Sequence, residues 1–188
     1  MPGVGAMKRL LREYKELSRS PPDGIAAAPV SDSNVFQWKV AMVGPEGSDY
    51  EGAFLTAVLD FPHNYPLAPP TMTFTTPVWH PNVYPSGKVC ISILHEGTDA
   101  SGYESATERW SPIQSVLSIV LSVLSMLADP NDESPANVDA AVEWRDNRPA
   151  FRARVKAHIE ASLGLSPELL RRYPASIAAS ASSTSSLL

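Results

Sequence analysis

Cys90 is the only cysteine among the 188 residues of this chain, and its surroundings favour chemistry over simple packing. Gly87 and Lys88 come just before it, so a turn precedes the thiol and a cation two residues away favours the thiolate. If residues 89–94 are extended, alternation puts the valine and isoleucines on one face and Cys90 on the other. A lone cysteine is often a small core side chain, but burial of the apolar face would turn this one outward.

Three polar side chains near Cys90 bear on what such a thiol could do. A hydrolytic cysteine needs a histidine base, and His80 and His95 are the nearest histidines in the sequence. His80 lies in a proline-rich stretch and is instead predicted to be structural, hydrogen-bonded to the loop backbone. Asn82 offers an amide donor to an oxyanion, or a strut that holds the loop. A thiol with such a donor and no evident base favours acyl transfer through a thioester. Hydrolysis would require His80 or His95 beside Cys90.

The composition argues against several other kinds of site. One cysteine rules out a disulfide framework, and four histidines without ligand spacing give no reason to expect a structural metal site. Residues 20–144 contain three basic and fifteen acidic side chains, a balance that would repel nucleic acid. The basic N-terminal segment fits either an acidic protein surface or a solvated helix face. It lacks the apolar core of a secretory signal, and a single free thiol suits a reducing compartment.

The periodicity of the apolar residues predicts the elements that must hold this segment. Apolar side chains from Met7 to Leu17 recur at helical spacing, which predicts an amphipathic helix over 5–19. Downstream, apolar residues alternate with polar ones in runs joined by short turns, which predicts an antiparallel meander. The four predicted strands are 25–30, 35–43, 53–61 and 71–75.

A second helix, predicted over 112–128, is rich in apolar residues. Ser111 would cap it, Pro112 would take its first position and Gln114 would complete a capping box. At about 17 residues it is at the short limit for a membrane span, and its stripe of serines favours a core helix lying across the sheet. Two further helices are predicted at 138–146 and 148–163. The expected fold class is therefore α+β in one domain.

The segment "HPNVYPSGKVCISIL" resembles the active-site signature of ubiquitin-conjugating enzymes, with a His-Pro-Asn motif and the cysteine eight residues after the asparagine. "FPHNYPLAPP" is similar to their proline-rich loop, and "WSPIQSVLSIVLSVLSMLADPNDESPANVDAA" to their central helix and the segment after it. The resemblance covers 5–164 and implies a catalytic domain there. The implied fold has an N-terminal helix, a four-stranded antiparallel meander sheet, the central helix and C-terminal helices. Residues 165–188 are expected to be a largely disordered C-terminal extension.

The resemblance implies a role for each candidate in the cysteine segment. Cys90 would accept ubiquitin from the activating enzyme as a thioester, and Asn82 would stabilise the oxyanion formed by lysine attack, with no cofactor. The stretch "ISILHEGTDASGYESATER" resembles the acidic-loop insertion of the subfamily that serves endoplasmic-reticulum-associated degradation. His95, Asp99 and Glu108 would line the cleft and assist the incoming lysine.

The resemblance also implies surfaces for partners. Lys8, Arg9 and Arg12 would contact the activating enzyme and form part of the ligase face, and two loops would meet a RING-type ligase. The residues expected in those loops are His63, Tyr65, Pro66, Ser111 and Pro112. With no membrane span expected, a recruitment protein bound to the back of the last helices would bring the chain to the cytosolic face of the endoplasmic reticulum. The alternatives are a conjugating enzyme for a ubiquitin-like modifier, or a non-catalytic ubiquitin-presenting module that would lack Cys90.

Overall fold

The computed structural model describes residues 3–97 and 108–163 of the chain. Asp99 and the extension at 165–188, for both of which the sequence made predictions, lie outside the described residues. The elements in chain order are α1 (Val4–Arg19), β1 (Ile25–Ser31), β2 (Asn34–Val43), β3 (Phe54–Asp60), β4 (Thr71–Phe74), η1 (Ser92–Leu94), α2 (Val116–Ala128), α3 (Val138–Asp146) and α4 (Arg148–Ser162). Of these, η1 is a short 3₁₀ helix.

The strands form one antiparallel sheet in the order β1-β2-β3-β4, which confirms the predicted meander. Each strand agrees with its predicted range to within one residue at either end. In β2, Trp38, Val40 and Met42 are buried while Lys39 between them is exposed, because successive side chains point to opposite faces of the sheet.

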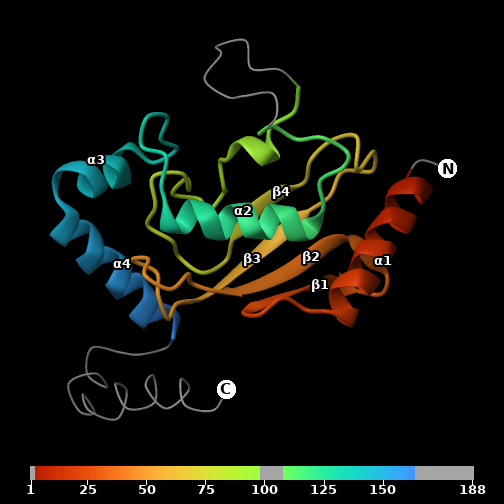
Figure 1. Ribbon diagram of the computed structural model, residues 1–188, viewed down its shortest axis with the longest axis horizontal. Helices are drawn as coiled ribbons and strands as arrows, with labels where there is room; N and C mark the ends of the chain where they lie inside the picture. The colour runs from red at the N-terminus through yellow and green to blue at the C-terminus, as the bar shows by residue number, and fades with distance from the viewer. Residues whose placement is uncertain (1–2, 98–107, 164–188) are drawn as a thin grey trace.

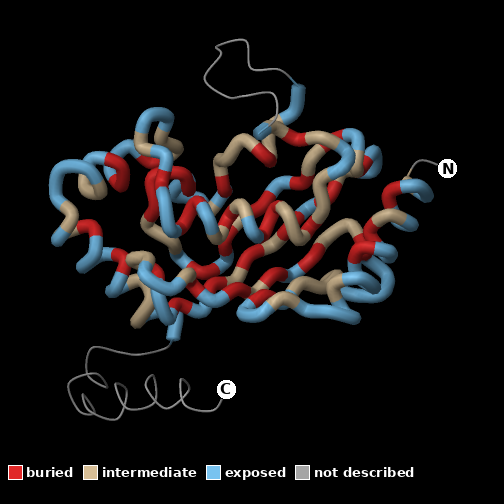
Figure 2. Tube along the Cα trace, in the orientation of Figure 1, coloured by how far each residue is buried: buried red, intermediate tan, exposed pale blue. Residues whose placement is uncertain are grey.

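The helices surround this sheet in a fixed arrangement. Figure 1 shows α2 across one face of the sheet, α1 at one end of the molecule, and α3 and α4 at the other. Buried positions concentrate along the strands and along α2, as Figure 2 shows. The buried residues of α2 are Val116, Ile119, Val120, Val123, Met126 and Leu127. The expectation of a core helix is therefore confirmed, and no helix within the described ranges is long and apolar enough to cross a membrane.

α1 confirms the helix predicted over 5–19 and packs against β1 and β2. Its buried residues are Ala6, Leu10 and Glu13, which lie three or four residues apart and so share one face. A glutamate on this inner face was not expected from the apolar pattern. Its hydrogen-bond partners come from two other parts of the chain.

α2 begins at Val116, so the prediction that it starts at Pro112 with Ser111 as its cap is wrong. Residues 111–114 form a separate turn, closed by a hydrogen bond of 3.0 Å from the Gln114 nitrogen to the Ser111 carbonyl oxygen. In addition, a carboxylate oxygen of Glu13 accepts a hydrogen bond of 2.7 Å from the Val116 nitrogen. This partner is remote in sequence, so the local pattern placed the start of the helix too early.

Ser115 is the residue that caps α2. Its hydroxyl accepts from the Ser118 nitrogen at 3.2 Å, and the Ser118 hydroxyl accepts in return from the Ser115 nitrogen at 2.8 Å. This reciprocal pair is a capping box in which serine replaces the usual glutamate or glutamine. The repeated serines of this region offered more than one place where such a box could form.

α3 and α4 confirm the two predicted C-terminal helices, with α4 ending one residue before the predicted 163. Asn137 and Asn147 cap them, each through a side-chain oxygen that accepts from a backbone N–H three residues on. Asp49, in the connection between β2 and β3, holds α4 in place. Its carboxylate contacts Arg148 and Arg152, each at 2.9 Å.

Candidate active site

His80 lies at the base of the cysteine segment and is fully buried. The Asn82 nitrogen donates to its Nδ1 at 2.9 Å, so Nδ1 carries no proton, and Nε2 donates to the Met126 carbonyl oxygen at 3.0 Å. Burial lowers the pKa of His80 to about 4, and the hydrogen bond to Met126 opposes that change only in part. The neutral imidazole thus joins this segment to α2. With both nitrogens occupied, it is not available as a base for Cys90.

The side-chain amide of Asn82 is held at both of its polar atoms. Nδ2 donates to the Asn131 carbonyl oxygen at 2.7 Å, and Oδ1 accepts from the Asn131 nitrogen at 2.9 Å. The backbone oxygen of Asn82 also accepts from the Cys90 nitrogen at 2.9 Å. Asn82 therefore fixes Cys90 on one side and the segment after α2 on the other, and its amide has a defined orientation.

Cys90 is half-buried, between the core and the open surface. Its Sγ lies 3.6 Å from Nε2 of His95, within hydrogen-bond range for sulfur. Val89 and Ile93 on either side are buried and anchor the segment. Val89 and Ile93 therefore face the core, as predicted, although the backbone after Cys90 is not extended throughout.

The chain after Cys90 turns into η1, so residues 89–94 do not form the single extended run considered from the sequence. Two successive tight turns close it, from the Leu94 nitrogen to the Ile91 oxygen at 3.0 Å and from the His95 nitrogen to the Ser92 oxygen at 2.9 Å. In an extended run, residues five positions apart would be about 16 Å apart. The two turns instead return His95 to the thiol, so a histidine does lie beside Cys90.

Tyr84 is a neighbour of Cys90 that sequence reasoning missed. The negative charge of a Cys90 thiolate, and a hydrogen bond to it, raise the pKa of Tyr84. A tight turn presents this tyrosine, with a hydrogen bond of 2.8 Å from the Gly87 nitrogen to the Tyr84 oxygen and one of 2.9 Å from the Tyr84 nitrogen to the Lys88 oxygen. Gly87 has a φ of +87°, and a Cβ there would lie 2.5 Å from the Phe74 oxygen. The glycine was the available signal for this turn.

A groove of about 540 Å³ lies between η1 and the serine face of α2, and its lining begins at Ile91, the residue after Cys90. Its lining includes Ile91, Ser92, Ile93, Glu108, Ser118, Ser122 and Ser125. Of the predicted cleft residues, His95 contacts Cys90 and the exposed Glu108 lines this groove, while Asp99 is not among the described residues. Across 3–97 and 108–163, no cluster of His, Cys, Asp and Glu side chains is arranged to hold a metal ion.

The basic residues predicted to meet partners on α1 differ in their surroundings. Lys8 and Arg12 are exposed, as a surface contact requires. Arg9 is only half-exposed and points inward, with its Nε 2.6 Å from a Glu13 oxygen and an Nη 2.8 Å from the Gln114 carbonyl oxygen. Its guanidinium joins α1 to the segment before α2, a role that the sequence did not suggest.

The two loops predicted to meet a ligase lie against one another. The Trp110 indole nitrogen donates to the Pro66 carbonyl oxygen at 2.8 Å, which connects the loop after β3 to the segment before α2. His63 and Pro112 are exposed, and Pro66 and Ser111 are half-buried. These residues therefore lie on or near one continuous part of the surface.

Tyr65 is buried, so its predicted place on the contact surface is wrong. Its hydroxyl donates to a Glu13 oxygen at 2.7 Å, and burial, followed by the charge of Glu13, raises its pKa. Sequence reasoning missed two apolar residues that these loops do expose, Leu67 at 73% and Ile113 at 88%. A large apolar residue directly after a proline in a loop was the available signal for both.

The matches to known proteins agree with this geometry. Residues 9–159 match the family model described as "Ubiquitin-conjugating enzyme", a range that includes the whole sheet, the cysteine segment and α2. The chain belongs to the ubiquitin-conjugating enzyme family. The fold expected from the resemblance is therefore the fold observed, with an N-terminal helix, a four-stranded antiparallel sheet and further helices.

Several curated members of the ubiquitin-conjugating enzyme family are similar over most of their length. The chain is 56% identical to ubiquitin-conjugating enzyme E2 14 of Arabidopsis thaliana over 154 residues, which cover 81% of this chain and 92% of that protein. It is 55% identical to human ubiquitin-conjugating enzyme E2 G2 over 161 residues, which cover 85% and 98%. Ubiquitin-conjugating enzyme E2 15 of Schizosaccharomyces pombe is 50% identical over 164 residues, which cover 87% and 98%.

Membership in the ubiquitin-conjugating enzyme family argues against two alternatives for Cys90, a non-catalytic ubiquitin-presenting module and a Cys-His hydrolase. The chain is an enzyme of this family. It keeps the cysteine that a non-catalytic ubiquitin-presenting relative would lack. His95 does lie beside Cys90, as a Cys-His hydrolase would require, but the fold and the relatives are those of conjugating enzymes.

Proposed function

We propose that Cys90 accepts ubiquitin from the activating enzyme as a thioester and, together with a RING-type ligase, passes it to a lysine of a substrate or of another ubiquitin. The observation that carries this proposal is the position of the thiol. It is half-buried, 3.6 Å from His95, and next to a groove whose lining begins at Ile91. Such a groove would receive the extended C-terminal tail of ubiquitin.

The first step is thioester exchange. The Cys90 thiolate attacks the carbonyl carbon that joins ubiquitin to a cysteine of the activating enzyme. A new carbon–sulfur bond forms to Cys90, the old carbon–sulfur bond breaks, and the thiolate of the activating enzyme leaves. The stiff segment around Cys90, held by His80 and Asn82, keeps the sulfur in place for this exchange.

The second step is attack by a lysine. The amine forms a carbon–nitrogen bond, the carbon–sulfur bond breaks, Cys90 leaves as a thiolate, and the proton of the amine passes to a base. We propose His95 and Glu108 as the side chains that orient the amine and accept this proton, with Asp99 as a further candidate on the same loop.

Asn82 is our candidate for stabilising the oxyanion of the second step. Asn131 holds its amide at both polar atoms, so the dipole is oriented before the reaction begins. A donor oriented in advance needs no reorganisation as the charge develops. Asn82 would thus act both as a strut and as an oxyanion donor.

Two surfaces would meet the protein partners. The ligase would dock on the adjacent loops, with the exposed Leu67 and Ile113 as apolar contacts, because burial of apolar surface favours protein association. The loop residues around them are His63, Pro66, Ser111 and Pro112. The exposed cations Lys8 and Arg12 would contact an acidic surface of the activating enzyme.

We further propose that the enzyme serves endoplasmic-reticulum-associated degradation at the cytosolic face of that membrane. The support is the segment between Cys90 and Trp110, which resembles the insertion of the corresponding subfamily. A recruitment protein bound to the back of α3 and α4 would bring the enzyme to the membrane. Residues 5–164 would form the catalytic domain, and 165–188 an extension of it.

A charging assay tests the central proposal. The protein is incubated with activating enzyme, ATP and ubiquitin, then run on gels with and without reductant. A product one ubiquitin heavier and removed by thiol is expected for the wild-type chain and not for Cys90→Ala. Cys90→Ser should give an oxygen ester that resists thiol. No thiol-sensitive product, or the same product from Cys90→Ala, would disprove the proposal. Ubiquitin-like modifiers in place of ubiquitin test the alternative modifier.

A further inference from the structure

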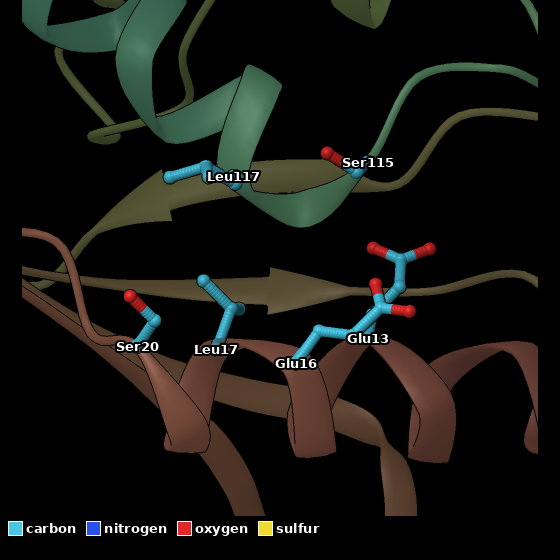
Figure 3. Close-up of a pocket in the computed structure, with 6 residues that line it drawn as sticks. All are labelled: Glu13, Glu16, Leu17, Ser20, Ser115 and Leu117. Carbon is cyan, nitrogen blue, oxygen red and sulfur yellow. The ribbon is translucent and has the colours of Figure 1, made fainter.

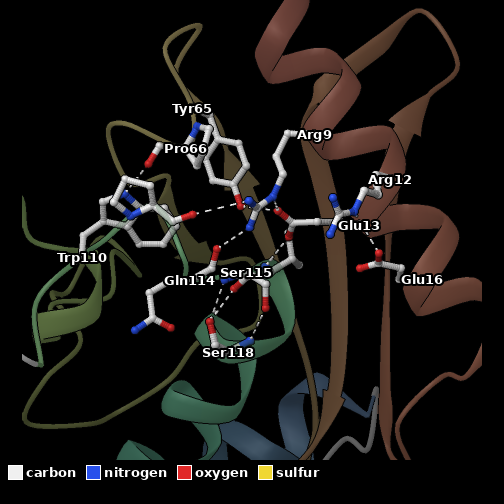
Figure 4. Close-up of polar contacts among 12 residues, drawn as sticks. Arg9, Arg12, Glu13, Glu16, Tyr65, Pro66, Trp110, Gln114, Ser115 and Ser118 are labelled. Atoms are coloured by element: carbon white, nitrogen blue, oxygen red, sulfur yellow. Dashed lines mark hydrogen bonds and ion pairs between the residues drawn. The ribbon is translucent and has the colours of Figure 1, made fainter.

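Glu13 is a buried charge with complete hydrogen bonding. It is 4% exposed, and one carboxylate oxygen accepts from Arg9 Nε at 2.6 Å and from the Tyr65 hydroxyl at 2.7 Å. The other oxygen accepts from the Val116 nitrogen at 2.7 Å. Figure 4 shows the side chains of Glu13, Arg9 and Tyr65 meeting near the start of α2. A buried carboxylate is tolerated only when its partners hold good geometry, so these three donors are held closely in place.

These partners belong to three separate parts of the chain, which are also linked to one another. Arg9 is on α1, Tyr65 is in the loop after β3, and Val116 begins α2. Arg9 also donates to the Gln114 carbonyl oxygen at 2.8 Å, and Trp110 just upstream donates to the Pro66 carbonyl oxygen at 2.8 Å. We call Arg9, Glu13 and Tyr65, with the backbone at 114–116, the Glu13 junction.

The Glu13 junction lies beside both exposed apolar residues of the loops. Leu67 follows Pro66, whose carbonyl accepts from Trp110, and Ile113 precedes Gln114, whose carbonyl accepts from Arg9. Leu67 is 73% exposed and Ile113 is 88% exposed. The spacing between the two side chains is therefore set by hydrogen bonds within one or two residues of each of them.

Packing between α1 and the start of α2 is incomplete at this point. A pocket of about 150 Å³ lies between them, lined by Glu13, Glu16, Leu17, Ser20, Ser115 and Leu117. Figure 3 shows Glu13 on α1 facing Ser115, the residue just before α2. Side chains do not fill this space, and the hydrogen bond from the Val116 nitrogen to Glu13 connects the two helices beside it. The hydrogen bonds of Glu13 therefore hold the two helices in register.

We propose that Glu13 is a positioning residue for ligase docking. It would touch no partner, but would hold Leu67 and Ile113 at the separation that the RING domain recognises. This inference rests on the proposed function, because it assumes that a RING-type ligase docks on these loops. Loss of the Glu13 carboxylate should weaken the response to the ligase and leave the chemistry at Cys90 unchanged.

Glu13→Gln is the principal variant. The donors Arg9 Nε and Val116 N face opposite oxygens of the carboxylate, and neither can accept a hydrogen bond. Either orientation of glutamine therefore sets an N–H group against a donor. Asp49→Asn is the matched control. It removes the charge of a carboxylate that also contacts residues of another element, Arg148 and Arg152, but these contacts connect the segment between β2 and β3 to α4.

Each protein is charged with ubiquitin, and its discharge to free lysine is followed while an isolated RING domain is titrated. The RING domain is one that accelerates the wild-type protein, chosen from a purified panel. We expect the half-saturating concentration to rise about tenfold in Glu13→Gln, with the plateau rate and the ligase-free rate unchanged. Asp49→Asn should keep the wild-type half-saturating concentration, and thermal unfolding of each protein measures the structural loss.

The outcomes separate this inference from the function on which it rests. If no RING domain accelerates the wild-type protein, the proposed ligase step fails and this inference with it. If the wild-type protein responds and Glu13→Gln responds equally well, or loses its ligase-free rate in parallel, only the inference is overturned. If Glu13→Gln does not fold, Tyr65→Phe decides. Removing that single hydroxyl should raise the half-saturating concentration about threefold, and no rise would overturn the inference.

Discussion

His80 stays uncharged in the folded protein, because its Nδ1 accepts a hydrogen bond and burial opposes protonation. Its pKa of about 4 lies below the ordinary value of 6.5, so the unfolded chain binds a proton more readily than the folded one. The stabilisation from neutral His80 is therefore complete above pH 6.5 and is lost as the pH falls toward 4. The full loss would be about 3 kcal/mol.

We expect the free energy of unfolding of the wild-type protein to fall more steeply on acidification than that of His80→Gln. Urea unfolding at several pH values between 4 and 6.5 measures this free energy. His63→Gln is the matched control, because it makes the same substitution at an exposed histidine. Equal pH dependence in the wild-type protein and His80→Gln would contradict the assignment.

Single residues were predictable from the sequence where local chemistry decided their role. The lone thiol beside a glycine and a lysine identified Cys90, and a histidine among prolines identified His80 as a hydrogen-bonded residue. Tyr65 was placed among the ligase-facing residues by the resemblance, and local sequence could not show its buried partner, Glu13, which is 52 residues away in the chain. Tyr84 was missed because only the turn at Gly87 brings it to Cys90.

At the scale of the element, the structure differs from the sequence pattern in the residue that caps α2, which is Ser115 and not Ser111. We expect Ser115→Ala to lower the free energy of unfolding by about 1 kcal/mol, because it removes the acceptor for the Ser118 nitrogen. Ser111→Ala, at the position that the sequence favoured as cap, should change it little. Urea unfolding measures both, and a larger loss in Ser111→Ala would disprove the assignment.

Elements were predictable wherever apolar periodicity is decided locally. The spacing from Met7 to Leu17 located α1, and alternation around Trp38 located β2, because each element buries one face against the same core. The start of α2 and the turn at η1 were not predictable in this way. Glu13 of α1 fixes the first, and successive tight turns after Ile91 replace an extended run in the second.

At the scale of the whole molecule, long-range polar contacts assemble the site. Glu13 reaches the start of α2 across 103 positions, Asn82 reaches Asn131 across 49, and His80 reaches Met126 across 46. Each contact connects a segment of the site or of the partner surface to a helix or to the chain beside one. Such pairings follow from the complete fold, so local sequence patterns cannot specify them.

Asn82 both holds the site together and is the proposed oxyanion donor, so its replacement should lower both the stability of the protein and the rate of discharge. Asn82→Ala removes two hydrogen bonds to Asn131 and should lower the free energy of unfolding by about 2 kcal/mol. It should also slow single-turnover discharge to lysine by about 100-fold or more, because an oxyanion donor is lost. Charging by the activating enzyme should continue.

Asn137→Ala is the control that separates the two losses of Asn82→Ala. Asn137 is also buried, caps α3 and donates from its backbone nitrogen to the Pro81 oxygen at 2.9 Å, so it supports the same segment. Its replacement should cost about 1 kcal/mol of stability and leave discharge from folded protein near the wild-type rate. If Asn82→Ala, measured well below its unfolding temperature, discharges as fast as Asn137→Ala, then Asn82 is a strut alone and the oxyanion must find its donor elsewhere.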